Sequence, residues 1–157
     1  MTSSLEIRPA LVANVLLAEA GSSDPGYSIE VVSPVAIVRR WPGLCIKAER
    51  SYRDVRGPID TLIITGTDTP DEATQDAGLV PWLTRVAPRT QRLVGMCTGT
   101  FALAAAGLLD GRRATSHWMF CDELTRLFPK IQVERDPIYV RDGAIYTGAS
   151  MLCDWLP

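Results

Sequence analysis

A short apolar strand that runs directly into a glycine-flanked cysteine, and then into an apolar helix, constrains this chain more than any other feature. The segment Arg92–Gly111 reads RLVGMCTGTFALAAAGLLDG. Its centre, GMCTG at residues 95–99, is a G-x-C-x-G sequence, the cysteine form of a nucleophile elbow. In such an elbow a sharp strand-to-helix turn strains the backbone of the nucleophile, and the flanking glycines relieve the crowding. The pattern therefore predicts Cys97 as a nucleophile at a strand-to-helix turn.

The chemistry of Cys97 follows from that position. A sulfur at a helix N-terminus lies near backbone N–H groups and the positive end of the helix dipole, which favour a thiolate over a thiol. The same N–H groups can receive a developing oxyanion. The alternative is a small buried cysteine in a turn that contains glycine. The apolar strand before Cys97 and the apolar helix after it favour the elbow, because that context confirms the motif.

The rest of the chain alternates apolar strands with helices, which predicts an α/β layered domain with a mainly parallel sheet. Asp60–Thr65 has the composition of a strand buried on both faces, Ser116 has the character of a helix N-cap, and Asp142–Gly143 predicts a hairpin turn. The predicted strands are Ser28–Ser33, Val35–Arg39, Leu44–Ala48, Asp60–Thr65, Arg92–Met96, Ile131–Val133, Ile138–Val140 and Ala144–Thr147. The predicted helices are Pro9–Ala20, Leu79–Ala87, Thr98–Leu108 and Ser116–Phe128. No linker or repeat interrupts the pattern, so we expect a single domain over residues 1–157.

Three residues outside the elbow are candidates for the same site. His117 is the only histidine and lies 20 residues after Cys97, after the next predicted loop, so it is a candidate base or thiolate partner; the alternative is a capping or core histidine beside Trp118. Gly66 ends the Asp60–Thr65 strand and is a candidate oxyanion contributor or a plain turn glycine. Glu6 is a candidate partner for the thiol or an exposed N-terminal charge.

Composition excludes several classes of function. The 157-residue chain has a net charge of -2, so it is a poor candidate for binding nucleic acid by itself. No apolar run approaches the ~20 residues of a membrane helix, and the N-terminus has no signal-peptide pattern. The four cysteines include no C-x-x-C pair, which favours reduced thiols in the cytoplasm and no structural zinc. We therefore expect a cytoplasmic protein with no metal site.

The run GMCTGTFALAAAGLLDGRRATSHW, residues 95–118, resembles the PfpI-like branch of the class I glutamine amidotransferase superfamily. It is most similar to the amidase-like sensor domains of AraC-type transcriptional regulators and to the isocyanide hydratases, and the resemblance covers about Pro9 to Asp154. It implies a flavodoxin-like three-layer sandwich, a homodimer, and no cofactor. It also places Cys97 in the elbow pocket and His117 near it. The residues that it implies around a substrate are Gly66, Thr67, Thr98 and Gly99.

The chain departs from the family pattern at both ends. Family members begin with a buried central strand and an acidic residue, whereas only residues 1–4 precede Leu5-Glu6 here. We therefore expect the first strand to be missing, with Glu6 a loose counterpart of the acid that contacts the cysteine. The family's last helix and the helix-turn-helix module of the regulators have no counterpart before Pro157.

Three functions stay open at this point. The first is a sensor domain that binds a small amine, amide or carbonyl metabolite beside Cys97 and acts through a dimer. The second is a cysteine-dependent hydratase or amidohydrolase, in which backbone N–H groups near Thr98 and Gly66 stabilise an anion while His117 or Glu6 moves protons. The third is an inactive truncated fragment.

Overall fold

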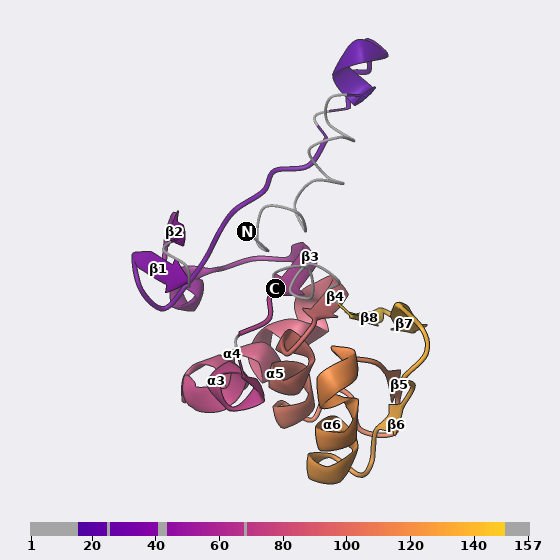
Figure 1. The fold of residues 1–157 in the computed structure, drawn as a ribbon. Helices are drawn as coiled ribbons and strands as arrows, with labels where there is room; N and C mark the ends of the chain where they lie inside the picture. Colours follow the sequence, from indigo (N-terminus) through magenta and orange to yellow (C-terminus); the bar gives the residue numbers. More distant parts are fainter. Residues whose placement is uncertain (1–15, 25, 41–43, 68, 150–157) are drawn as a thin grey trace. The chain divides into compact units, whose positions relative to one another are not determined.

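A computed structural model describes residues 16–24, 26–40, 44–67 and 69–149 of the chain. The chain divides into two compact units, Met1–Arg56 and Gly57–Pro157. Figure 1 colours the chain along its sequence and labels its elements. Each unit has its own secondary structure and is described by itself, so the expectation of a single domain stays a prediction.

The first unit contains a two-stranded antiparallel hairpin. Its strands β1 (Ile37–Arg40) and β2 (Leu44–Lys47) lie where strands were predicted. A short 3-10 helix, η1 (Tyr52–Asp54), follows. Residues 16–19 are helical, and the rest of the predicted helix before them lies outside the described residues.

The predicted strand Ser28–Ser33 is wrong. Its only ladder contact in the described part of the chain is an isolated parallel bridge between Val32 and Arg50. The backbone there exchanges two hydrogen bonds with the chain around Arg50, from Ser33 N–H to the Arg50 carbonyl and from Glu49 N–H to the Val31 carbonyl. A β-branched run forms a strand only where a partner of similar length pairs with it.

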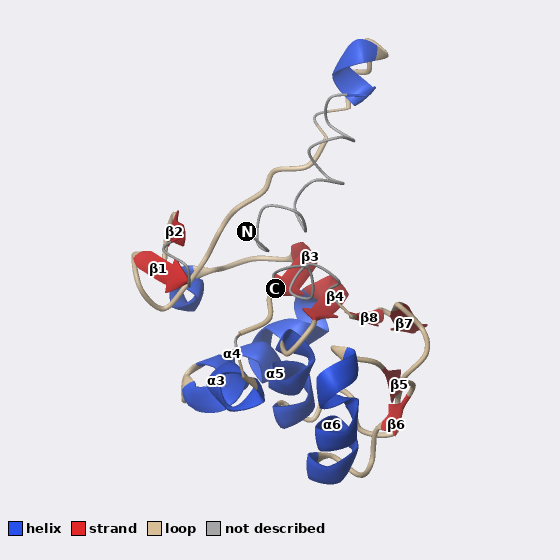
Figure 2. Ribbon diagram, in the orientation of Figure 1, coloured by secondary structure: helices blue, strands red, loops and turns tan. Residues whose placement is uncertain are grey.

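The second unit is built on a four-stranded sheet with the order β3-β4-β8-β7 (Figure 2). Strands β3 (Ile59–Ile64), β4 (Thr90–Met96) and β8 (Ile145–Gly148) are parallel, and β7 (Tyr139–Asp142) is antiparallel to β8. The prediction of a mainly parallel sheet in an α/β fold is therefore confirmed. The hairpin turn between β7 and β8 is also confirmed, with Gly143 at a φ of 63°.

Strand β3 is less buried than its sequence predicted. Leu62 is buried, but Asp60, Thr61 and Ile63 are exposed, with Ile63 at 37%. The physical reason is its place in the order: β3 is the outermost strand of the described sheet and pairs only with β4 there. The prediction of burial on both faces, drawn from apolar composition, was wrong for this strand.

Helix α5 (Gly99–Ala105) packs on β4 and forms the core of the second unit. Helices α3 (Pro70–Gln75) and α4 (Leu79–Val86) pack against α5 in turn, and the 3-10 helix η2 (Ala87–Arg89) leads into β4. The largest fully buried side chains are Phe101, Leu83, Leu103, Leu109 and Leu124.

Two helical predictions need correction. The segment Ser116–Phe128 is a 3-10 helix, η3 (Trp118–Phe120), followed by α6 (Cys121–Leu127), because His117 rather than Ser116 caps its start. Helix α3 was not among the predicted helices. Its signals were nevertheless in the sequence, since Thr69 caps it and Pro70, Asp71 and Glu72 fill its first turn.

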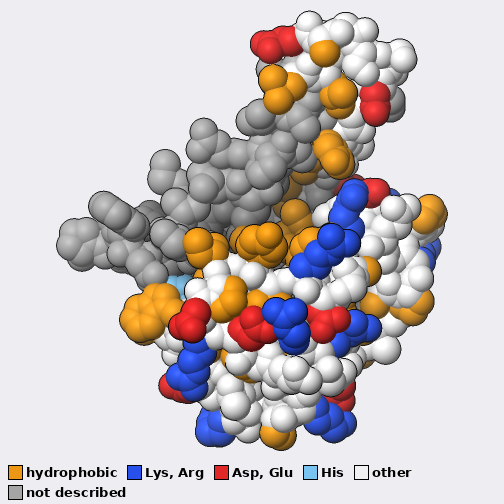
Figure 3. All heavy atoms as spheres, turned by 90° about the vertical axis from the view of Figure 1, so that its right-hand side faces the viewer, with side chains coloured by type: hydrophobic (Ala, Val, Ile, Leu, Met, Phe, Trp, Pro, Cys, Tyr) orange, Lys and Arg blue, Asp and Glu red, His pale blue; other side chains and the backbone are white. Residues whose placement is uncertain are grey.

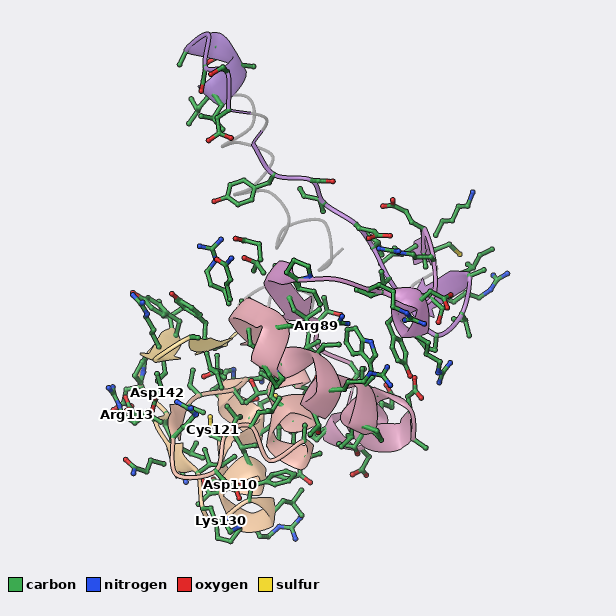
Figure 4. The ribbon with its side chains drawn as sticks, turned by 180° about the vertical axis from the view of Figure 1, so that it is seen from behind. Arg89, Asp110, Arg113, Cys121, Lys130 and Asp142 are labelled. Atoms are coloured by element: carbon green, nitrogen blue, oxygen red, sulfur yellow. The ribbon has the colours of Figure 1, made fainter. Side chains whose placement is uncertain are left out.

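A second, smaller parallel sheet lies beside the β7–β8 hairpin. Its strands are β5 (Arg113–Ala114) and β6 (Gln132–Val133). Asp142 accepts a hydrogen bond from the Arg113 N–H at 2.9 Å and forms an ion pair with Arg112 at 3.1 Å. Figure 4 labels Asp142 next to Arg113. These contacts anchor the hairpin to the small sheet. Of the helices in the described ranges, none has the length and apolarity that crossing a membrane requires.

Candidate functional site

Cys97 has the backbone conformation of a nucleophile elbow. Strand β4 ends at Met96, α5 begins at Gly99, and Cys97 between them has a φ of 54°. It is the one non-glycine residue with a positive φ in the described part of the chain. This left-handed conformation costs a residue with a Cβ about 1–2 kcal/mol, so the surrounding structure must hold it. The strained turn predicted at Cys97 is therefore present.

Three glycines permit this turn, each through a close approach. An added Cβ on Gly99 would overlap the carbonyl oxygen of Ile64, so α5 rests directly on the end of β3. A Cβ on Gly95 would lie 2.9 Å from Leu103 Cδ1. A Cβ on Gly66 would lie 3.0 Å from the Cβ of Cys97. The Gly66 backbone therefore forms a wall directly against the Cys97 side chain.

Hydrogen bonds between Thr98 and Thr67 fix the Gly66–Thr67 loop against the elbow. The hydroxyl of Thr98 accepts a hydrogen bond from the Thr67 N–H and donates one to the Thr67 carbonyl, both at 2.7 Å. Thr98 is fully buried. Because the single hydroxyl proton is used within the protein, the Thr98 side chain holds the Gly66–Thr67 loop in place. Contact with a substrate through the backbone of Thr98 and through Gly66, Thr67 and Gly99 stays a prediction.

His117 lies beside the elbow and caps the next helix. The neighbouring Ser116 donates a hydrogen bond to the Cys97 carbonyl at 2.8 Å, which brings this segment alongside the cysteine. His117 is 4% exposed, and its Nδ1 accepts a hydrogen bond from the Met119 N–H at 3.3 Å. Its ring lies 5.7 Å from that of Trp118. The capping interpretation is confirmed, and with Nδ1 an acceptor, neutral His117 carries its proton on Nε2. Its role as a base for Cys97 stays a prediction.

Sequence reasoning missed Ser116 as a residue of the site. It was predicted as an N-cap, but His117 has that position and the Ser116 hydroxyl turns to Cys97 instead. Spacing alone gave no signal, because serine is common in loops and the hydrogen bond joins residues 19 apart.

Exposed hydrophobic side chains flank this region. Trp118 and Met119 directly follow His117, and Ile138 and Tyr139 have their backbone or Cβ within 4 Å of an ideal Cβ on Gly148. The carbonyl of Gly148 accepts a hydrogen bond from the Cys97 N–H at 2.7 Å. Figure 3 shows hydrophobic side chains that reach the surface on the face it draws. These four exposed residues therefore lie on segments next to Ser116 and Gly148, which hydrogen-bond to the Cys97 backbone.

The remaining predicted site residue, Glu6, lies outside the described residues. The described part of the chain has no group of three His, Cys, Asp or Glu side chains that could hold a metal ion. Cys121, four residues after His117, is buried and directs its sulfur to the carbonyls of Ser116 and His117 at 3.7 and 3.6 Å.

The fold and this turn together define an α/β domain with a cysteine in a nucleophile elbow. The chain belongs to the DJ-1/PfpI family, which its sequence matches over residues 12–153. The resemblance to PfpI-like proteins drawn from the sequence is therefore confirmed.

Three relatives illustrate how varied the family is. An uncharacterized protein from the cpoL 5′ region of Streptomyces lividans is 34% identical over 73% of this chain and 81% of its own length. Isonitrile hydratase of Pseudomonas putida is 30% identical over 69% of this chain and 46% of its length. The HTH-type transcriptional regulator CdhR of Pseudomonas aeruginosa is 38% identical over 57% of this chain. This chain covers only 26% of that regulator.

Solved structures agree on the fold. A THiJ/PfpI family protein from Pseudomonas syringae has a TM-score of 0.69 at 28% identity, and the alignment covers 90% of this chain and 57% of that protein. An AraC family transcriptional regulator from Pseudomonas putida has a TM-score of 0.68 at 20% identity, covering 90% of this chain and 75% of that one. At 20% identity the second likeness shows the fold alone.

Proposed function

We propose that this chain is a small-molecule-sensing domain of the kind found in AraC-type regulators, with its ligand bound at the Cys97 elbow. The observation that supports the proposal is the conformation of Cys97, whose φ of 54° holds a thiol against the Gly66 wall. Several relatives are named HTH-type transcriptional regulators. In this proposal the domain works in the cytoplasm as a homodimer, without a cofactor, and leaves DNA binding to a separate module.

The geometry favours a small ligand with an amine, amide or carbonyl group. Two neutral hydroxyl side chains lie at the elbow: Ser116 donates to the Cys97 carbonyl, and Thr98 fixes the facing loop. The Thr98 N–H, on the residue after the nucleophile, suits an oxygen acceptor. The exposed hydrophobic residues beside the elbow suit a ligand with an apolar body.

A second candidate is a cysteine-dependent hydratase. The likeness to isonitrile hydratase over 69% of the chain favours it. In that reaction the Cys97 thiolate adds to the isonitrile carbon and a proton is taken up, which gives a thioimidate. Water then adds to the same carbon, and the thiolate leaves with an N-substituted formamide as product. His117 and Glu6 are the candidates to move the protons.

One experiment separates these functions. The full chain and Cys97→Ala are titrated with a panel of small amides, amines, aldehydes and an alkyl isonitrile, with binding followed by calorimetry and product formation by mass spectrometry. Binding without turnover, lost in Cys97→Ala, supports the sensor. Turnover that Cys97→Ala abolishes supports the enzyme. If the full chain shows no binding and no turnover, both functions are contradicted, and the inactive truncated fragment remains.

A further inference from the structure

The peptide that follows the nucleophile is fixed by a hydroxyl group outside the elbow. The Cys97 carbonyl accepts hydrogen bonds from the Thr100 N–H at 3.2 Å and from the Ser116 hydroxyl at 2.8 Å. The Cys97 N–H, on the preceding peptide, donates to the Gly148 carbonyl at 2.7 Å. Both peptides of this strained residue are therefore held, and the shortest bond to its carbonyl comes from Ser116.

The Cys97 carbonyl and the Thr98 N–H belong to the same peptide. A trans peptide is planar, and its C=O and N–H point in opposite directions. A bond that fixes the direction of the carbonyl therefore also fixes the direction of the Thr98 N–H. In a nucleophile elbow, the N–H of the residue after the nucleophile is an oxyanion donor. Donation to the carbonyl also polarises the peptide and strengthens its N–H as a donor.

Ser116 is itself held in place by two other hydroxyl groups. The Thr115 N–H donates to Thr147 Oγ1 on β8 at 2.8 Å, and Thr100 Oγ1 on α5 donates to the Thr115 carbonyl at 3.2 Å. These residues are buried, with Ser116 at 1% exposed. A buried hydroxyl with fixed neighbours has few alternative partners, so it holds the Cys97 carbonyl in one direction.

We propose that Ser116 is a positioning residue for the Cys97 site, and that it aims the Thr98 N–H at the charge that develops on or beside the sulfur. The inference rests on the proposed function, in which Cys97 is the reacting or binding group. Ser116 touches the backbone of the nucleophile and acts on a ligand only through the Thr98 peptide.

The test measures the alkylation rate of each cysteine by iodoacetamide against pH, in the full chain, by peptide mass mapping. Loss of the hydroxyl in Ser116→Ala leaves the Thr98 N–H less well aimed, so the thiolate loses stabilisation. We expect the midpoint of the Cys97 profile to rise by about 1 pH unit, with an about tenfold lower rate near pH 6, which is the effect of one buried hydrogen bond. Ser116→Thr, which keeps the hydroxyl, restores the wild-type profile.

Thr90→Ala is the matched control. Thr90 begins the strand that Cys97 follows, and its hydroxyl also donates to a backbone carbonyl, that of Val86, at 3.0 Å. We expect its Cys97 profile to match the wild type. A merely structural role for Ser116 would lower the thermal midpoint of Ser116→Ala and leave the pH midpoint of Cys97 unchanged.

The outcomes are distinguishable. If wild-type Cys97 reacts with the free-thiol midpoint of about 8.5, the inference fails, because there is no stabilised thiolate for Ser116 to support, while the proposed function is decided by the ligand titration. If wild-type Cys97 is activated and Ser116→Ala keeps its midpoint, the inference alone is overturned. If Ser116→Ala does not fold, Ser116→Cys replaces it, since a thiol keeps the size of the side chain but donates weakly. Its Cys97 midpoint must then rise, and an unchanged midpoint overturns the inference.

Discussion

The elbow and the β7–β8 hairpin are held by different kinds of polar contact. At the elbow, the buried hydroxyls of Thr98 and Ser116 bond to backbone groups. At the hairpin, the partly exposed carboxylate of Asp142 bonds to Arg112 and to the Arg113 N–H. A buried group that loses its partner bears the full cost of desolvation, whereas exposed charges return to water. Substitutions at the elbow should therefore cost much stability. Substitutions at the hairpin should cost little, and the loss of stability should depend on pH.

The largest effect is expected for Gly99→Ala. The new methyl group would overlap the Ile64 carbonyl, so the backbone of α5 or of β3 would have to shift. We expect a loss of about 3 kcal/mol in the free energy of unfolding, measured by urea denaturation. Gly148→Ala is the control, because its Cβ would meet ordinary contacts at 3.5 Å or more. Equal losses in the two variants would contradict the close approach of α5 and β3.

Thr98→Val should have the next largest effect. Valine keeps the shape of threonine but leaves the Thr67 N–H and carbonyl without the partner that now satisfies both. We expect a loss of about 1–3 kcal/mol in the free energy of unfolding. Thr84→Val is the control, since Thr84 is exposed and its hydroxyl only bonds back to the Val80 carbonyl; its change should stay within about 0.5 kcal/mol. An unchanged free energy of unfolding in Thr98→Val would show that the Thr98–Thr67 hydrogen bonds contribute nothing to stability.

The hairpin should weaken in acid. Hydrogen bonds from the Arg113 N–H and then from Arg112 lower the pKa of Asp142. Folding therefore favours the ionised carboxylate, and this stabilisation is present above the unfolded pKa of about 3.9 and is lost as the pH falls through the lower, folded pKa. We expect Asp142→Asn to be less stable than the wild type at pH 7 and to approach it below about pH 4, in urea denaturation across that range.

Asp136→Asn is the control for this prediction, because Asp136 is an exposed carboxylate on the loop before β7. Its difference from the wild type should stay small at every pH. A difference for Asp142→Asn that does not change with pH would mean that the carboxylate contributes through shape and not through charge.

The smallest effect is expected for Lys130→Gln. Lys130 forms an ion pair with Asp110 at 2.8 Å, and the side chain is 75% exposed; Figure 4 labels both residues. An exposed pair of this kind is screened by salt and contributes little. We expect a thermal midpoint indistinguishable from the wild type in 0.15 M salt. A clear decrease would contradict the assignment of surface ion pairs to the weak class of contacts.

The parts of the structure that sequence predicted are those set by local patterns. The elbow at residues 95–99 was predicted because glycine spacing, an apolar strand and an apolar helix all occur within one short segment. The β7–β8 hairpin was predicted because Asp142–Gly143 encodes its turn. The family follows from the same local segments, and the match over residues 12–153 confirms it.

The parts that sequence did not predict depend on contacts between distant segments. The exposure of Ile63 follows from the outer position of β3, which a β-branched run does not reveal. The role of Ser116 depends on a hydrogen bond to a residue 19 positions away. The commitment of the Thr98 hydroxyl depends on a loop 31 positions away. Residue type gives the chemistry of each group, and only packing gives its partner.

Because of the positive φ at position 97, the residue that is best for fold stability differs from the residue that supplies a reactive group. A glycine there would adopt the same backbone angle without steric cost, so a thiol is the less stable choice for this turn. A library randomised at position 97 and sorted only for resistance to heat should therefore become enriched in glycine. The same library sorted for reaction with an electrophile should keep cysteine, and the two selections together would measure how much fold stability this protein gives up to carry its sulfur.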